Sequence, residues 1–364
     1  MKIYINGRFL TQSITGVQRY AFEILHALDE YIGKFNNRNI ELIILAPINI
    51  KYEPRFKCIK LRIVGKTKGH LWEQFELPFY CKDNLLLNFC NTGPIIKKNQ
   101  IVTIHDAAVF ANPKNFSFAF RTWYQILLRL LTRRSKQIIT VSNFSCNELH
   151  KYCKVKSNLQ VIPGSKEQIL RINSDNTILE KHGLNKYEYV LAVSSMNPNK
   201  NFFSVIKAIN QLKDVECTFV IAGGKNSRVF ESVDLPVENN VIYVGYVNDA
   251  ELKSLYENAL CFVFPSFYEG FGLPPLEAMA CGCPVVVSNT ASLPEVCGDA
   301  ALYCDPHDVG DIAEKIKILV LDPGLRETMR QRSIERANQF TWEHSAVKLL
   351  TLIEEKVENG TNHG

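Results

Sequence analysis

Short apolar runs that alternate with helical patterns are the feature that most limits how this chain can fold. In the first half the runs are KIYI, ELIILA, LLLNF, QIVTIHD and QIITVS. In the second half they are YVLAVSS, CTFVIAGG, VIYVGYV, LCFVFPS and PVVVSN. They are rich in Ile, Val and Leu without regular apolar–polar alternation, which is typical of parallel strands buried on both faces. With the helical segments between them, they predict two successive doubly wound α/β domains.

The length agrees with two domains, because 364 residues exceed what one hydrophobic core usually organises. We expect a first Rossmann-like domain over residues 1–164, ending where Pro163 and Gly164 close a strand. A second such domain should cover residues 165–336. Residues 337–364 should form a helix that crosses back to brace the first domain, with a frayed tail.

Several features predict a cytoplasmic protein. Residues Asn6, Gly7 and Arg8 interrupt the apolar start, which does not resemble a signal peptide. No apolar run approaches the roughly 20 residues that cross a bilayer. The eleven cysteines are scattered, often in strand-like runs, and we interpret them as reduced thiols.

The charge is distributed unevenly. Residues 1–164 hold 24 Lys and Arg against 10 Asp and Glu, whereas the remainder holds 18 against 27. The basic first half indicates an anionic partner, which could be a phosphorylated ligand, a membrane surface or nucleic acid. A solvated basic face without a partner is the alternative. Nucleic acid is not expected, because the sequence has no RNA-stacking aromatic motif or zinc knuckle.

The stretch FYEGFGLPPLEAMACG, residues 267–282, carries the clearest chemistry. It follows a strand and opens a helix, so the backbone N–H groups of Gly272 and Leu273 can approach an anion at the helix N-terminus. Glu269 and Glu277 can accept hydrogen bonds from hydroxyl groups on either side of that anion. A phosphate flanked by hydroxyls describes a nucleotide sugar. The alternative is that Glu277 complements the helix dipole and Glu269 is merely solvated.

With the downstream ACGCPVVVSN, LPEV and GDAALYCDP, this stretch resembles the Glu-x7-Glu motif of a large retaining glycosyltransferase family, family 4 or "glycosyl transferases group 1". The resemblance covers nearly the whole chain and implies the GT-B architecture, in which two Rossmann-like domains face each other across a cleft. It implies that Glu269 contacts the donor sugar and Glu277 the ribose. The turn that would hold the diphosphate and sugar consists of Gly270, Phe271, Gly272 and Leu273.

Further matches to this family are weaker individually. The resemblance implies that Gly16 of SITGVQRY approaches the donor phosphates and that His105 of TIHDAAVF lies near the transferred sugar. An ordinary glycine turn and a structural histidine are the alternatives. In SSMNPNKNF, Lys200 should pair with the diphosphate. We place Ser195 in the donor site too, although many members have an arginine there, and Asn199 stands where a second basic residue is common.

A metal ion is not expected, because no Asp-x-Asp occurs and Lys200 with the helix N-terminus can neutralise the leaving group. By resemblance, the acceptor attacks from the face that the leaving group departs, through an oxocarbenium-like transition state. The departing phosphate oxygen can then take the acceptor's proton. The alternative double displacement would use Glu269 as nucleophile.

The acceptor is indicated by residues 116–137, where aromatic and apolar side chains mix with arginines. They predict either a helix at a membrane interface or a core helix packed on the first sheet, and both can hold in part. With the basic first half, they favour peripheral binding to the inner face of the membrane and a polyprenyl-diphosphate-linked saccharide acceptor.

The resulting hypothesis is a retaining hexosyltransferase in O-antigen, capsule or exopolysaccharide assembly, with mannose from GDP-mannose as the first choice of donor. A GT-B nucleotide-sugar epimerase and a non-catalytic sugar-binding subunit are the alternatives. An epimerase would turn over donor without an acceptor, and a binding subunit would not need the intact glutamate pair.

Overall fold

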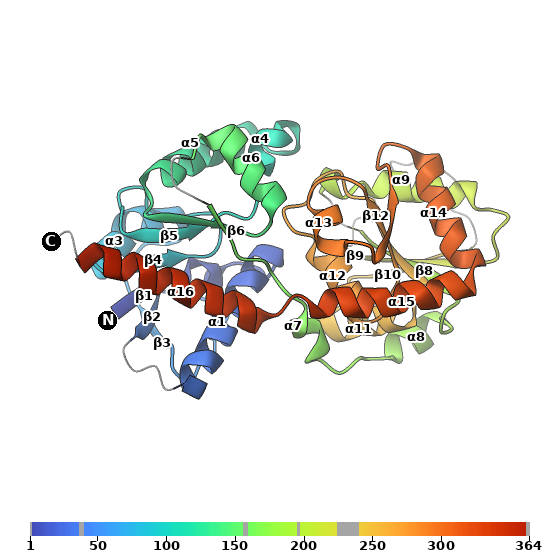
Figure 1. Ribbon diagram of the computed structural model, residues 1–364, viewed down its shortest axis with the longest axis horizontal. Coiled ribbons are helices and arrows are strands. Elements are labelled where there is room, and N and C mark those ends of the chain that lie inside the picture. Colours follow the sequence, from blue (N-terminus) through green and yellow to red (C-terminus); the bar gives the residue numbers. More distant parts are fainter. Residues whose placement is uncertain (1, 36–39, 156–158, 195–196, 224–239, 362–364) are drawn as a thin grey trace. The chain divides into compact units, whose positions relative to one another are not determined.

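The chain forms two compact units, each built around its own parallel sheet (Figure 1). The first unit comprises Met1–Gly164 with Thr341–Gly364, and the second comprises Ser165–Phe340. The computed structural model describes residues 2–35, 40–155, 159–194, 197–223 and 240–361.

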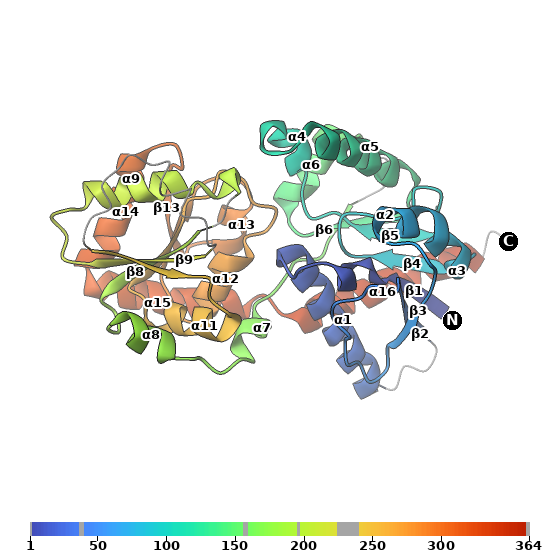
Figure 2. The ribbon, with the colours of Figure 1, turned by 180° about the vertical axis from the view of Figure 1, so that it is seen from behind.

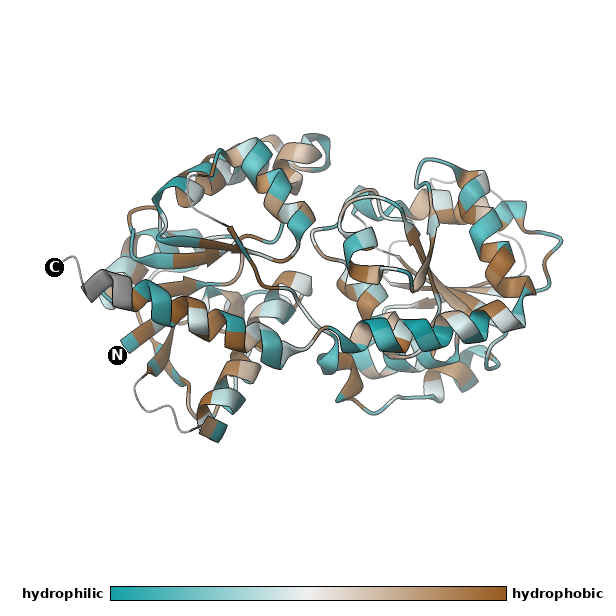
Figure 3. Ribbon diagram, viewed as in Figure 1, coloured by the Kyte–Doolittle hydropathy of each residue, from teal (hydrophilic) through white to brown (hydrophobic). Residues whose placement is uncertain are grey.

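The first unit contains a seven-stranded sheet in the order β3-β2-β1-β4-β5-β6-β7. All of its strand pairs are parallel. Most of these strands are buried and hydrophobic along their length, as the sequence pattern predicts (Figure 3). The strands are β1 (Lys2–Asn6), β2 (Glu41–Ala46), β3 (Lys60–Ile63), β4 (Leu85–Asn88), β5 (Gln100–Thr103), β6 (Gln137–Thr140) and β7 (Leu159–Val161).

Helices cover both faces of the first sheet (Figures 1 and 2). Two of them, α1 and the C-terminal α16, pack against each other on one face, and α5 and α6 lie on the other. The helical elements are η1 (Gly7–Thr11), α1 (Gly16–Phe35), α2 (Gly69–Leu71), η2 (Trp72–Glu76), α3 (Leu77–Cys81), α4 (Ala108–Ala111), η3 (Pro113–Asn115), α5 (Phe118–Arg134), α6 (Asn143–Cys153) and α16 (Trp342–Thr361).

Helix α5 shows how the segment 116–137 divides between core and surface. Its N-cap Ser117 accepts a hydrogen bond from the Phe120 backbone N–H, which fixes the start of the helix. Leu127, Leu128 and Leu131 are buried against the sheet. The predicted core helix is therefore present, and it also carries exposed large apolar side chains: Phe118, Phe120, Trp123 and Ile126.

The second unit contains a six-stranded parallel sheet in the order β10-β9-β8-β11-β12-β13. Its strands are β8 (Tyr189–Ser194), β9 (Thr218–Gly223), β10 (Val241–Gly245), β11 (Cys261–Phe264), β12 (Val285–Ser288) and β13 (Ala301–Cys304). One apolar cluster lies between this sheet and helices α9 and α14, and another lies under α11, α12, α13 and α15 on the opposite face. The predicted class, two doubly wound α/β domains, is confirmed.

The helical elements of the second unit follow the same alternation with strands. They are α7 (Glu167–Leu170), α8 (Thr177–His182), η4 (Pro198–Lys200), α9 (Phe202–Gln211), α11 (Asp249–Asn258), α12 (Leu273–Ala280), α13 (Leu293–Cys297), α14 (Val309–Leu321) and α15 (Pro323–Asn338). In the described part of the chain, no helix is both long and apolar enough to cross a membrane.

Both sheets reverse their strand order at one place. The reversal lies between β1 and β4 in the first sheet and between β8 and β11 in the second. In open parallel sheets, ligands bind outside the carboxyl ends of the strands at such a switch point. The loops that follow these four strands are therefore where a site is expected in each unit.

Candidate functional site

In the second unit, the loops after β8 and β11 are joined at the switch point. Phe267 N donates to Asn199 O at 2.7 Å, and Ser266 Oγ donates to the same carbonyl at 2.7 Å. Asn201 adopts a left-handed conformation, and its Nδ2 donates to Pro265 O at 3.0 Å. These bonds hold Lys200, on the first loop, close to the second loop.

Lys200 and Glu269 meet directly at this junction. Lys200 Nζ lies 2.5 Å from Glu269 Oε1, and Ser266 Oγ lies 2.7 Å from the same oxygen, so its one hydrogen is shared between Glu269 and Asn199 O. The ammonium also lies 4.9 Å from the centroid of the Phe264 ring. The side chains of Lys200 and Glu269 are 23% and 12% exposed, so the pair is partly open to solvent. The sequence predicted both residues for the site but not their pairing.

The glycine turn leads from Glu269 into α12 and is tightly constrained. Gly272 is the N-cap with φ at 104°, and a Cβ on it would lie 2.6 Å from Leu293 Cδ2. Only glycine fits both conditions. Ser292 Oγ lies 2.9 and 2.8 Å from the carbonyl oxygens of Glu269 and Phe271, and its one hydrogen, shared between them, braces the turn. The turn is thus held in shape beside the N-terminus of α12, where Pro274 and Pro275 follow Leu273 in the first turn.

Glu277 lies on α12 and is only 8% exposed. Its Oε1 accepts a hydrogen bond of 2.7 Å from Gln168 Nε2, on α7. Sequence reasoning missed Gln168, because nothing in its local sequence marks it. Ser266 and Ser292 were missed as well, although they stand directly after a strand and within the downstream motif.

In the first unit, His105 follows β5 and is buried. Its ring contacts the Tyr20 ring edge-on at 5.0 Å, and its Nε2 lies 2.8 Å from Phe89 O. A carbonyl only accepts, so Nε2 carries the hydrogen and Nδ1 does not. Burial lowers the pKa of His105 to about 4, and the imidazole is neutral at physiological pH.

Gly16 begins α1 and is exposed. No described atom lies within 4 Å of the place where its Cβ would stand. The described structure therefore gives no steric reason for glycine here, whereas a ligand lying close to the backbone would give one. The predicted donor residue Ser195 lies outside the described residues.

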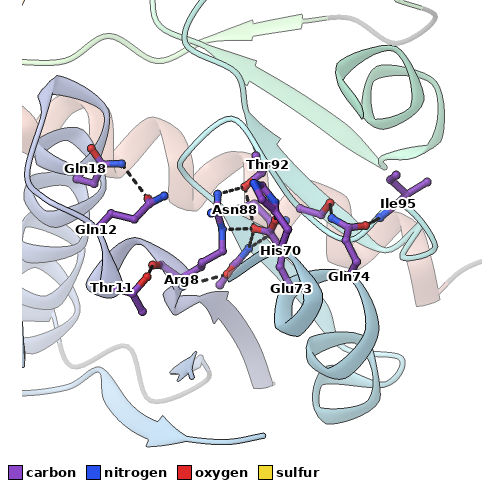
Figure 4. A network of polar contacts seen from close by, with 12 residues as sticks. Arg8, Thr11, Gln12, Gln18, His70, Glu73, Gln74, Asn88, Thr92 and Ile95 are labelled. Atoms are coloured by element: carbon purple, nitrogen blue, oxygen red, sulfur yellow. Dashed lines mark hydrogen bonds and ion pairs between the residues drawn. The ribbon is translucent and has the colours of Figure 1, made fainter. Parts of the chain in front are cut away.

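A group of polar residues that the sequence did not mark surrounds the other switch point, between β1 and β4 (Figure 4). Asn6 and Asn88 end these two strands, and their side chains bond to each other at 2.9 Å. Arg8 and Glu73 form a buried ion pair beside them, with Arg8 Nε at 3.0 Å from Glu73 Oε1. Neither strand pattern nor motif predicted this group, because its members are far apart in sequence.

Residues 174–336 match the family model described as "Glycosyl transferases group 1". The chain is 34% identical over 271 residues to O-antigen chain mannosyltransferase B of Escherichia coli, covering 70% of this chain and 69% of that protein. It is 28% identical over 326 residues to O-antigen chain mannosyltransferase RfbU of Salmonella typhimurium, covering 84% and 87%.

Solved structures share the fold at low identity. Sucrose-phosphate synthase from Thermosynechococcus elongatus superposes with a TM-score of 0.77 and 16% identity, covering 98% of this chain and 99% of that chain. HepE from Anabaena, in complex with UDP and glucose, superposes with a TM-score of 0.71 and 17% identity, covering 98% and 100%.

Proposed function

The chain belongs to the group 1 glycosyltransferases, and from that premise we propose that it transfers mannose from GDP-mannose to a lipid-linked saccharide in O-antigen, capsule or exopolysaccharide assembly. The mannosyltransferase relatives support the choice of sugar. The observation that carries the proposal is the Lys200–Glu269 pair beside the glycine turn and the N-terminus of α12. It combines a cation, a carboxylate and backbone donors at a switch point.

Binding of the donor would break the Lys200–Glu269 pair and give each side chain a new partner. Lys200 and the backbone N–H groups of Gly272 and Leu273 suit a diphosphate, because a cation and a helix N-terminus both stabilise anions. Once Lys200 binds phosphate, Glu269 is released to accept hydrogen bonds from hydroxyls of the sugar. Glu277, now bonded to Gln168, would accept from the ribose. The bound UDP and glucose of HepE support a nucleotide-sugar ligand for this fold.

The reaction we propose retains the anomeric configuration. The bond between the anomeric carbon and the diphosphate oxygen breaks, and the acceptor oxygen bonds to the same face of that carbon. The acceptor's proton passes to the departing phosphate oxygen, so no separate base is needed. Lys200 and the α12 N-terminus stabilise the charge on the leaving group, and we propose that no metal ion is required. A rate unchanged by EDTA would support that part.

His105 fits a role in binding rather than in proton transfer. Its Nε2 hydrogen is held by Phe89 O, and burial lowers its pKa to about 4. It is therefore a neutral residue at working pH and a poor general acid. We propose that it lies against the transferred sugar, with Nδ1 as a hydrogen-bond acceptor.

The test is calorimetry of the purified protein against UDP-, GDP- and dTDP-sugars, repeated with Glu269→Ala and Glu277→Ala. We expect GDP-mannose to bind selectively and both variants to lose at least tenfold in affinity. Binding of no nucleotide sugar, or binding that neither variant changes, would contradict the proposal. Consumption of donor without any acceptor would instead indicate an epimerase.

For the lipid-linked acceptor, we propose that the exposed face of α5 rests on an anionic membrane. Phe118 and Ile126 are 73% and 48% exposed, and Arg129 and Arg133 are exposed beside them. Apolar side chains with neighbouring arginines are typical of an interfacial helix. The protein should sediment with anionic vesicles at low salt, less at high salt, and less after the double change Phe118→Ser and Ile126→Ser. Phe203→Ser, an exposed phenylalanine of the second unit, is the matched control.

A further inference from the structure

The buried carboxylate of Glu73 is the centre of the polar group at the first switch point (Figure 4). Glu73 is fully buried, and its Oε1 accepts from Asn6 Nδ2 at 2.8 Å, Arg8 Nε at 3.0 Å and Thr92 Oγ1 at 2.7 Å. Arg8 Nη2 donates in turn to Thr92 Oγ1 at 2.7 Å. One carboxylate oxygen is thereby saturated by three donors from two separate segments, residues 6–8 and the loop after β4.

Glu73 is ionised despite its burial. Burial alone would raise its pKa, but the Arg8 guanidinium and the hydrogen bonds that it accepts hold the pKa at about 2. A buried ion pair is weak as a stabilising device, because well-packed apolar residues of similar volume often do as well or better. Stability alone therefore does not explain the presence of this buried charge.

The second oxygen of Glu73 indicates a role for this charge. Its Oε2 lies 3.2 Å from His70 Nδ1, and the His70 side chain is 37% exposed. A carboxylate only accepts, so Nδ1 carries a hydrogen toward Glu73. Within the described residues, we find no hydrogen bond to Nε2 of His70. In the neutral ring this nitrogen is an acceptor, available to a hydroxyl group of a ligand.

Two aromatic rings of α5 lie beside His70. The centroids of Trp123 and Tyr124 lie 5.9 and 6.1 Å from the imidazole, both edge-on. Tyr124 is stacked on Phe120 at 4.2 Å, and Trp123 is 37% exposed. A sugar ring packs its C–H face on an aromatic ring while its hydroxyls need polar partners. Trp123, Tyr124 and His70 supply both within one small area.

The backbone that carries Glu73 is itself unusual. Residues Trp72–Glu76 form a turn of π-helix between α2 and α3. Such turns are rare and are frequently found at functional sites, where they direct a side chain that a regular helix would place elsewhere. Here the turn carries Glu73, three residues after His70, at the end of β1 and β4.

We propose that His70, Trp123 and Tyr124 bind a sugar of the acceptor saccharide, with His70 Nε2 accepting from one of its hydroxyls. Glu73 is a positioning residue that fixes the tautomer and orientation of the imidazole, and Arg8 keeps Glu73 charged. This inference rests on the proposed function, because it assigns the acceptor side of the same transfer. A lipid surface is the other ligand that exposed Trp123 could contact, and the test separates the two.

Trp123 is a natural probe for this site. The chain has three tryptophans, and the other two, Trp72 and Trp342, are 0% and 3% exposed. Acrylamide should therefore quench mainly Trp123, and Trp123→Phe should remove most of the quenchable fluorescence. Methyl α-glycosides of mannose, glucose, galactose and N-acetylglucosamine are the probes. We expect at least one of them to protect Trp123 from the quencher. In the His70→Ala variant, the glycoside concentration needed for the same protection should be at least tenfold higher.

His150→Ala is the matched control, because His150 is also exposed and lies in the same unit, on α6. It should leave protection unchanged. Protection by none of the glycosides, or protection equal in wild type and His70→Ala, would overturn the inference. Protection by anionic vesicles but by no glycoside would overturn it in favour of a lipid contact.

The positioning role of Glu73 has its own readout. In ¹⁵N spectra of the histidine-labelled protein at pH 8.5, His70 should be the Nδ1–H tautomer, and Glu73→Gln should shift it toward Nε2–H. An unchanged tautomer would remove Glu73 from the inference. If Glu73→Gln does not fold, the His70→Ala experiment still decides the site. His70→Ala should not change the affinity for GDP-mannose measured by calorimetry. If the wild-type protein does not bind GDP-mannose, the proposed function is wrong. If it binds GDP-mannose but no glycoside protects Trp123, only this inference is wrong.

Discussion

In each unit a cation–carboxylate pair lies at the switch point of the sheet, and these two pairs differ in how firmly they are held. Arg8–Glu73 lies between β1 and β4, and Lys200–Glu269 lies between β8 and β11. The side chains of the first pair are 8% and 0% exposed, whereas those of the second are 23% and 12% exposed. The same pairing of charges therefore occurs in a closed and in a more open setting.

The residue types match these settings. Arg8 offers a planar guanidinium that bonds Glu73 and Thr92 at once, and Glu73 accepts from four side chains. Lys200 is a point charge on a flexible stem, and its ammonium pairs with the carboxylate of Glu269. A rigid, saturated pair serves to position neighbours, whereas a flexible pair can exchange its partner for a phosphate. We therefore interpret Arg8–Glu73 as part of the scaffold and Lys200–Glu269 as part of a ligand site, in two units of similar fold.

The largest expected effect is on the stability of the closed pair. Glu73→Ala should lower the free energy of unfolding by about 3–5 kcal/mol, because it leaves a buried guanidinium without its carboxylate. Denaturant unfolding measures this loss. The double change Arg8→Ala and Glu73→Ala should destabilise by less than the sum of the single changes. Additive losses would show that the two side chains do not act as a pair.

The open pair should respond in activity rather than in stability. Glu269→Ala should lower the transfer rate by about 10²–10³-fold, the effect of removing one group that contacts the reacting sugar. Its free energy of unfolding should change by less than about 1 kcal/mol, because the pair is partly solvated. Glu335→Ala, at an exposed glutamate on α15, is the control for charge removal. A stability loss as large as that of Glu73→Ala would end the contrast between the pairs.

Exchange of partners at Lys200 can be measured directly. Lys200→Met should weaken binding of GDP by about 10–100-fold, in line with roughly 1.5–3 kcal/mol for a charged hydrogen bond. Glu269→Gln should instead strengthen GDP binding several-fold, because it frees the lysine from its present partner. Lys207→Met, at an exposed lysine of α9, should change neither. Equal affinity in wild type and Glu269→Gln would show that the pair does not compete with phosphate.

Much of this architecture could be predicted from the sequence, and the reason is local. Ten apolar runs indicated most of the buried strands, and the loop that holds Glu269 and Gly272 is one contiguous stretch with its own turn chemistry. Membership of the group 1 glycosyltransferases was likewise identified correctly from that stretch. These features depend on neighbours in sequence, which periodicity and spacing report.

The polar group around Glu73 was not predictable by the same means. Its members come from β1 and η1, from β4 and the loop after it, and from a π-helical turn, and the bonds between these three regions join residues 19 to 84 apart. Each of them alone has an ordinary local sequence. The pairing of Lys200 with Glu269, 69 residues apart, was missed for the same reason. Such contacts follow from strand order, which the apolar pattern does not determine.

The smallest effect concerns the pH dependence of stability and His105, the neutral histidine that follows β5 in the sheet of the closed pair. Burial lowers the pKa of His105 to about 4 from an ordinary value of 6.5, so the unfolded chain takes up a proton before the folded one does. Stability from this residue is fully present above pH 6.5 and is lost as the pH falls toward 4. Between pH 6.5 and 5 the loss should be about 1–2 kcal/mol.

His105→Asn, which can still donate to Phe89 O, should remove that loss from the denaturation profile. The acid loss from Glu73, whose pKa is about 2, begins only below pH 4.5, so the two contributions separate on the pH axis. An identical slope above pH 5 in wild type and His105→Asn would show that His105 is protonated as readily in the folded protein as in the unfolded chain.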